Sequence, residues 1–410
     1  MTQLAILGGE PAIKNPFPRW PTWGPEEESQ LIETLRSGYW GLGSGKIEEW
    51  ENRFAEIQGA RHVASVANGT VSLMIALRAL GIGYGDEVIV PPYTFLATAS
   101  AVLWVGAIPL FADIDPATFN LSPDAASQAI TERTKAIIPV HIGGLPCDMD
   151  AFRKLADEHG LGLIEDAAQA HGAKWNGEGA GILGDIGSFS FQSSKNLSGG
   201  EGGMLVCRDE ELLERCIRIK NCGRPSGKTE SNLETLGANL RMSGFQAGIL
   251  LAQASRFAEQ FKQREKNWAF LKEAIEEIPG VELQARDPRV DGHALHLLIF
   301  RYDKNEFHGL SREGFLKAFE KEGVEAPHGG YQPIYRNPGF RADIGSYLRG
   351  LETPDYTALA LPNTEKVCAE TSIWVRQNSL LGETTSLVEG IAEAIKKIHR
   401  SSETLAHDLG

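Results

Sequence analysis

Short apolar runs alternate with amphipathic stretches along the first half of the chain. The apolar runs predict strands at 62–66, 87–90, 108–112, 136–140, 162–165, 186–191 and 204–207. Between them, helical spacing of apolar residues predicts helices at 25–37, 47–57, 71–80, 97–105, 123–130, 149–159 and 210–219. Such alternation is typical of an α/β fold with a mostly parallel sheet covered by helices on both faces. Ligands are then expected at the carboxyl ends of the strands.

The pattern changes in the second half. A long helical pattern covers 244–278, and mixed α+β signals follow: a strand at 295–301, a helix at 311–322, a loop at 328–340 and a helix near 384–398. The first residues are rich in Pro, Gly and Trp and indicate an irregular arm. We therefore expect an N-terminal arm at 1–24, a large domain at 25–275 and a small C-terminal domain at 276–410.

Composition narrows the possible partners. The formal net charge is -14, so the chain lacks the basic surplus that nucleic-acid or anionic-membrane binding needs. Its five cysteines are scattered, with no CxxC pair, and predict neither a disulfide framework nor a metal site. No apolar run approaches the ~18 residues of a membrane span, and no signal peptide begins the chain. We expect a soluble, cytoplasmic protein.

Two residues in the stretch 161–203 suggest chemistry. Lys195 lies among serines and glycines, and a lysine desolvated there would have a lowered pKa and could form a Schiff base with an aldehyde. Asp166 follows the predicted strand 162–165, where a carboxylate can keep a heterocyclic nitrogen protonated. The alternatives are a solvated surface lysine and an aspartate that caps the following turn.

Other candidates support a flat, phosphorylated ligand. Asn68-Gly69-Thr70 precedes a predicted helix, whose free N–H groups suit a phosphate, although an ordinary N-cap would have the same sequence. Phe95 could stack on a flat ring, although an aromatic residue at such a position is more often part of the core. Gln169 and His171 could hydrogen-bond a ring oxygen, and a buried structural histidine is an equal alternative for His171.

The motifs EDAAQAHG, GSFSFQSSKNLSGGEGG, NGT and PPYTFLAT together resemble the DegT/DnrJ/EryC1/StrS family of pyridoxal-phosphate sugar aminotransferases. The similarity is greatest to the scyllo-inosose aminotransferases and the 3-amino-5-hydroxybenzoate synthases. The resemblance implies a fold-type I homodimer with pyridoxal 5'-phosphate at the subunit interface. It implies that Lys195 binds the cofactor and carries protons. It further assigns the cofactor ring to Phe95, Asp166 and Gln169, and the phosphate to Gly69, Thr70, Ser190 and, from the other subunit, Asn239.

The expected reaction transfers an amino group from glutamine or glutamate to a keto-cyclitol or keto-sugar. Two alternatives stay open: a dehydration–aromatisation like that of the aminohydroxybenzoate synthases, and a non-catalytic regulator. The loop with His328 and Tyr331, and with Tyr335 and Arg336 beyond it, could bind a polyol or could pack between domains. A lysine rather than a histidine at position 195 argues against the sugar dehydratases of the family.

Overall fold

The computed structural model describes residues 3–227, 233, 235–382 and 384–409. Its centre is a seven-stranded sheet in the order β1-β9-β8-β5-β4-β2-β3. Only β9 runs against the others, pairing antiparallel with both β1 and β8, so the predicted mostly parallel sheet is confirmed. The strands are β1 (His62–Val66), β2 (Glu87–Val90), β3 (Ile108–Phe111), β4 (Thr134–Ile137), β5 (Gly162–Asp166), β8 (Ile186–Ser190) and β9 (Gly203–Cys207).

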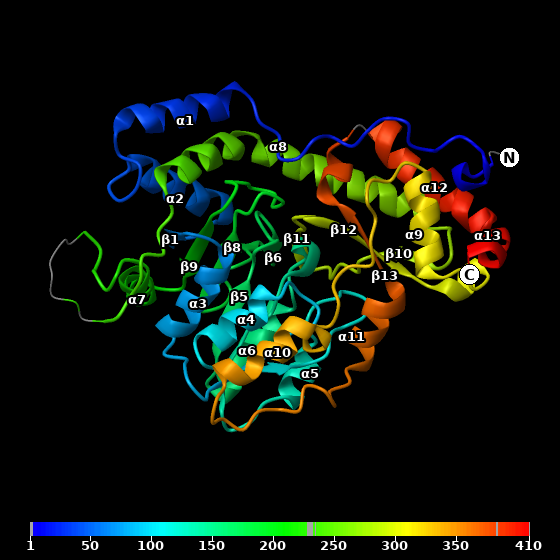
Figure 1. Cartoon of the computed structure of the whole chain (residues 1–410). Coiled ribbons are helices and arrows are strands. Elements are labelled where there is room, and N and C mark those ends of the chain that lie inside the picture. Colours follow the sequence, from blue (N-terminus) through cyan, green and yellow to red (C-terminus); the bar gives the residue numbers. More distant parts are fainter. Residues whose placement is uncertain (1–2, 228–232, 234, 383, 410) are drawn as a thin grey trace.

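Helices cover both faces of this sheet because its strands are apolar on both sides. In β5, Ile164 packs into the cluster under α3, α4 and α7, while Leu163 packs into the opposite cluster with α6. On the second face, α1 and α2 lie along the long helix α8 (Figure 1). These helices are α1 (Pro25–Ser37), α2 (Gly45–Gln58), α3 (Gly69–Ala79), α4 (Ala97–Trp104), α5 (Pro123–Gln128), α6 (Met149–His159), α7 (Glu210–Lys220) and α8 (Gly244–Ile275).

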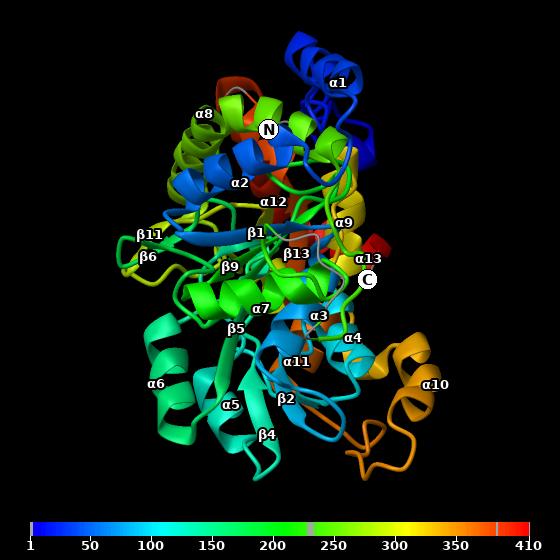
Figure 2. The same cartoon turned by 90° about the vertical axis from the view of Figure 1, so that its left-hand side faces the viewer.

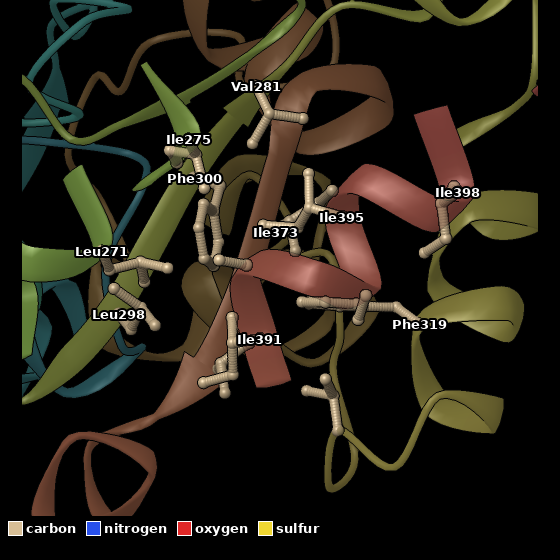
Figure 3. Close-up of a cluster of buried hydrophobic side chains, with 14 of the residues drawn as sticks. Leu271, Ile275, Val281, Leu298, Phe300, Phe319, Ile373, Ile391, Ile395 and Ile398 are labelled. Atoms are coloured by element: carbon tan, nitrogen blue, oxygen red, sulfur yellow. The ribbon is translucent and has the colours of Figure 1, made fainter. Parts of the chain in front are cut away.

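A second core surrounds a three-stranded antiparallel sheet, β10-β12-β13. Figure 3 shows Phe300 of β12 and Ile373 of β13 against α12, with Leu271 and Ile275 of α8 on the other side. Leu4 and Phe17 of the N-terminal arm are buried in the same cluster. The elements are β10 (Val281–Leu283), β12 (Leu297–Tyr302), β13 (Ser372–Arg376), α9 (Arg312–Lys321), α12 (Glu389–Arg400) and α13 (Ser402–Leu409). The domain boundary near residue 275 stays a prediction.

The chain between these last strands returns to the first core. Tyr335, Phe340 and Tyr356 pack against Phe111 of β3, and α10 (Pro338–Tyr347) lies beside α4 (Figure 2). The expectation of a plain loop at 328–340 was therefore wrong for the last residues of that range, because their apolar side chains are buried against the first core. The helix predicted near 384–398 is observed as η7 (Thr384–Val388) followed by α12. Short elements without periodicity went unpredicted: β6 (Lys174–Trp175), β7 (Glu178–Gly179), β11 (Val290–Gly292), α11 (Pro362–Lys366), η1 (Ala5–Leu7), η2 (Ile142–Gly144), η3 (Lys304–Phe307), η4 (Ile334–Arg336), η5 (Val367–Thr371) and η6 (Gln377–Leu381).

Two further observations concern the expectations from composition. The five cysteines are free thiols, four of them buried. Within the described parts of the chain, no helix has both the length and the apolar character needed to cross a membrane.

Glu165, at the end of β5, fixes the loop that leads into β8. Its fully buried carboxylate accepts the backbone N–H groups of Gly181, Leu183 and Gly184 at 2.7, 2.7 and 2.6 Å, and lies 2.9 Å from His141 Nε2. Since a carboxylate only accepts hydrogen bonds, the amide of glutamine would face these donors with an N–H group.

We expect Glu165→Gln to lower the free energy of unfolding by about 2–5 kcal/mol, because it leaves buried donors unpaired. Urea unfolding measures the loss. Glu158→Gln is the matched control, since the Glu158 side chain is exposed and its pair with Lys154 should contribute less than about 0.5 kcal/mol. Equal midpoints for the two variants would contradict this role of Glu165.

Candidate active site

A cavity of about 1600 Å³ opens at the carboxyl ends of the central strands. Its wall is built from both halves of the chain: the starts of α3 and α4, the ends of β5 and β8, the loop between β8 and β9, and the segments around positions 296, 328 and 376. It brings together most of the predicted residues: Gly69, Thr70, Phe95, Asp166, Gln169, Ser190, Lys195, His328 and Tyr331.

Asp166 presents a buried carboxylate to this cavity. It is the last residue of β5 and is 6% exposed. Thr98 Oγ1 donates to Oδ2 at 2.8 Å, and the backbone N–H of Ala168 donates to Oδ1 at 3.2 Å. Burial raises the pKa of Asp166, while these hydrogen bonds and the positive charge of Lys195 act in the opposite direction. The turn-capping alternative is thus partly true, yet each oxygen retains acceptor capacity for a ligand.

Lys195 lies in the loop between β8 and β9 and faces the same cavity. Desolvation lowers the pKa of its ammonium to about 8, and the nearby charge of Asp166 limits the decrease. The side chain forms no ion pair within 4.0 Å in the described chain, so it is available to a ligand. An amine with a pKa this close to neutrality can act both as a nucleophile and as a proton carrier.

The start of α3 offers an anion site to the cavity. Asn68 caps the helix by accepting the N–H of Val71 at 3.0 Å, so the N-cap interpretation holds for Asn68. The N–H groups of Gly69 and Thr70, in the first turn, have no helical partner and remain available. Ser190, at the end of β8, lies directly against Gly69: a Cβ added at Gly69 would be 2.7 Å from the Cβ of Ser190.

This close contact predicts that Gly69→Ala will destabilise the protein by about 1–3 kcal/mol, because α3 must shift away from β8. The shift should also weaken anion binding at the helix start. Gly45→Ala provides the control, because Gly45 also begins a helix and a Cβ there would meet nothing within 4 Å. Thermal unfolding with and without inorganic phosphate measures both effects; identical behaviour of the two variants would refute the steric argument.

Phe95 and Gln169 occupy other parts of the wall. The Phe95 side chain is 61% exposed, which is unusual for a phenylalanine and leaves its ring free to contact a ligand. Gln169 is held by the backbone N–H of Gly143, which donates to its Oε1 at 2.8 Å. Its Nε2 donates to the hydroxyl of Tyr331 at 3.4 Å, which links the end of β5 to the loop at 328–331.

Some candidates lie away from the cavity. His171 is fully buried beside Phe189 and Phe191, so the structural alternative is correct for it, and burial lowers its pKa to about 3. Tyr335 and Arg336 both bind Glu365 and do not contribute to the cavity wall. Asn239 is exposed outside the cavity. Its contact with a second subunit stays a prediction.

The structure adds residues that sequence reasoning missed. Thr98 binds Asp166 directly, and His296, Trp374 and Gln377 line the cavity. The first lies in the predicted helix 97–105 and the others in or beside strands, so each has the sequence signature of an ordinary core position. No local spacing distinguishes them, because their role depends on contacts between distant segments.

The sequence model of the DegT/DnrJ/EryC1/StrS aminotransferase family matches residues 21–386. The chain belongs to this family. An L-glutamine:2-deoxy-scyllo-inosose aminotransferase of Streptomyces paromomycinus is 35% identical, over 98% of this chain and 99% of the relative. A 3-amino-5-hydroxybenzoate synthase of Amycolatopsis mediterranei is 35% identical, over 93% of this chain and 98% of the relative. A crystal structure of 3-amino-5-hydroxybenzoic acid synthase superposes with a TM-score of 0.83 at 35% identity, covering 93% of this chain and 100% of that one.

Membership of the DegT/DnrJ/EryC1/StrS family confirms two predictions. The protein is an aminotransferase, and its mostly parallel sheet with helices on both faces is the architecture of fold-type I transferases. The relatives include enzymes of both branches named in the sequence analysis, so family membership alone does not select the substrate.

Proposed function

We propose that this protein is a pyridoxal-phosphate-dependent aminotransferase that moves an amino group from glutamine or glutamate to a keto-cyclitol or keto-sugar. The observation that carries the proposal is the pairing of a buried carboxylate, Asp166, with a low-pKa amine, Lys195, in one cavity. The scyllo-inosose aminotransferase among the relatives supports the choice of donor and acceptor.

The residues present fit the cofactor. The α3 start and Ser190 would hold the phosphate, since the first N–H groups of the helix have no helical partner and Ser190 lies directly against Gly69. Phe95 would contact the ring face, Gln169 would lie near the ring oxygen, and Asp166 would bind the ring nitrogen. When bound, pyridoxal phosphate supplies an electron sink for the negative charge that develops at the substrate carbon.

The chain's own groups then perform the proton transfers. Lys195 would remove the proton from the α carbon of the amino donor and hold it on Nζ until it is returned. The pKa of about 8 for Lys195 allows it to gain and lose a proton near neutral pH. Asp166 stays ionised when a protonated ring nitrogen pairs with it, and it thereby keeps that nitrogen charged.

His328 and Tyr331 are the proposed contacts for the acceptor. Both line the cavity, and their rings pack on Trp374 with centroids 5.4 and 4.7 Å away. The Tyr331 hydroxyl and the His328 imidazole are suitable partners for the hydroxyl groups of a polyol ring.

We also propose a homodimer. Large apolar side chains are exposed on the α1–α2 connection and near Asn239: Trp40 is 51% exposed, Leu42 66% and Leu236 89%. A second copy would cover them, and Asn239 could then reach the phosphate of the other subunit. Sedimentation of the purified protein tests this assembly.

The reaction is tested in two halves. Protein loaded with pyridoxal phosphate is mixed with L-glutamine or L-glutamate, and conversion to the pyridoxamine form is followed by absorbance. The converted protein is then offered a panel of keto-cyclitols and nucleotide-linked keto-sugars. Failure of every amino donor to change the spectrum would overturn the proposal and favour a regulator, while release of an aromatic product would favour the dehydration–aromatisation.

A further inference from the structure

One cation buried behind the cavity has no acidic partner. Arg264 of α8 is fully buried, and no carboxylate of the described chain lies within ion-pair distance of its guanidinium. Its Nη1 makes no hydrogen bond there either, and its carbon Cζ lies 5.4 Å from the centre of the Trp20 ring. Burial lowers the pKa of Arg264 to about 9, so the group still carries its charge at neutral pH. A buried cation of this kind is costly and calls for a role.

Arg264 orients one side chain of the cavity wall. Its Nε and Nη2 both donate to Gln377 Oε1, at 3.2 and 2.7 Å. Because a guanidinium only donates, the oxygen of the Gln377 amide must face Arg264, and the NH₂ group must point the other way. Gln377 is 3% exposed and lines the cavity, and its Nε2 has no hydrogen-bond acceptor among the described residues. The cavity wall therefore holds a hydrogen-bond donor, Gln377 Nε2, in a fixed orientation and without an acceptor.

A second cation lies beside this donor. Arg376, the last residue of β13, lines the same cavity, is exposed to it and forms no ion pair within the described chain. Burial lowers the pKa of His328, and the positive charge of Arg376 lowers it further. Glu201 and Glu325 also line the cavity, but Glu325 accepts the backbone N–H of Phe17, and neither glutamate is paired with Arg376 or Arg264.

We infer that Gln377 and Arg376 form the binding site for the carboxylate of the amino-acid donor. The amide NH₂ of Gln377 donates to one carboxylate oxygen, Arg376 supplies the positive charge, and Arg264 keeps the amide in the donating orientation. A carboxylate is favoured over a sugar hydroxyl because the Gln377 NH₂ group and Arg376 only donate. Two cations without an acidic partner also lie nearby, Arg376 on the wall and Arg264 behind it. The inference rests on the proposed function, since it assigns a substrate group to the same cavity.

Gln377→Glu removes the proposed hydrogen-bond donor, the NH₂ group of Gln377, without destabilising the fold. The glutamate retains an oxygen for Arg264 and should form a buried ion pair with it, so urea stability should be unchanged or higher. The variant removes only the NH₂ group and puts negative charge where the carboxylate would bind. We expect the KM for L-glutamine to rise about 10- to 100-fold in the first half-reaction. The kcat of that step and the KM for the keto substrate should change less than about threefold.

Three further measurements, with one control variant, test whether the effect is specific to the carboxylate. The α-carboxamide analogue of L-glutamine lacks the carboxylate, so Gln377→Glu should reduce the preference for L-glutamine over this analogue by the same factor. Arg376→Gln, at an exposed position that should not affect folding, should raise the KM for L-glutamine about tenfold. Arg264→Lys should also raise this KM with little effect on kcat, because it loses the two-pronged contact. Arg78→Gln removes an exposed charge from α3 outside the cavity and is the matched control.

The possible outcomes separate the two proposals. If the unchanged protein is not converted by any amino donor, the proposed function fails. Suppose that the unchanged protein is converted, and that Gln377→Glu and Arg376→Gln both have the same KM for L-glutamine as the unchanged protein. The carboxylate site is then refuted, while the aminotransferase function stands.

Discussion

Lys195→Ala is expected to abolish transamination and the visible absorbance of the bound cofactor. In the proposed mechanism, the variant lacks both the amine that would attach pyridoxal phosphate and the base that would move the substrate proton. A loss of at least about 10³-fold in turnover is expected, since a positioned acid–base group alone contributes 10²- to 10⁴-fold. Single-turnover conversion with L-glutamine, followed by absorbance, measures the loss. Lys174→Ala, in an exposed lysine of β6, is the matched control.

The free energy of unfolding of Lys195→Ala distinguishes a loss of catalysis from a loss of folding. The pKa of Lys195 is lowered to about 8 from the model-peptide value of 10.5, so the folded state binds fewer protons than the unfolded state between these pH values. The free energy of unfolding of the cofactor-free protein should therefore rise as pH increases through this window. Lys195→Ala should lack that rise and should be about 1–3 kcal/mol more stable near pH 7. A less stable variant, or retained turnover, would contradict the assignment.

Asp166→Asn is expected to lower turnover by about 10²- to 10³-fold, because a neutral amide cannot hold a positive charge on the ring nitrogen. The negative charge of Asp166 also raises the pKa of Lys195, so its removal should lower that pKa below about 8. The pH dependence of labelling of Lys195 by an aldehyde, in the cofactor-free protein, measures this second effect.

The fold should tolerate the change at Asp166. Burial raises the pKa of this carboxyl, which means that its charge is costly in the folded state. Unlike the backbone N–H groups around Glu165, the Thr98 hydroxyl can accept as well as donate. Asparagine can therefore keep the Ala168 N–H on its oxygen and direct its NH₂ group to Thr98, so the free energy of unfolding should stay at or above its present value. Asp124→Asn, in the exposed first turn of α5, is the control for loss of charge. An active Asp166→Asn, or an unshifted Lys195, would exclude Asp166 from the proposed role.

The regular elements of the first half and the long helix α8 were predictable because each carries its own periodic pattern. The strands of the central sheet and α1 to α8 were identified within a few residues, since burial repeats at strand or helix spacing within each segment. Strands as short as β6, β7 and β11 escaped because they have too few residues to show a pattern. The return of the segment with Tyr335 and Tyr356 to the first core escaped for another reason: local sequence does not specify the distant partner.

By itself, the sequence determined the fold class and singled out Lys195 and Asp166 as the candidate chemical groups, because both inferences depend on local motifs and on periodicity. Only the tertiary structure decided which polar groups share the cavity. His171 is directed into the core, Thr98 reaches Asp166, and Arg264 meets Gln377 across 113 residues of chain. Their roles depend on which oxygen and nitrogen atoms come within hydrogen-bond distance after packing, and packing between distant segments sets those distances.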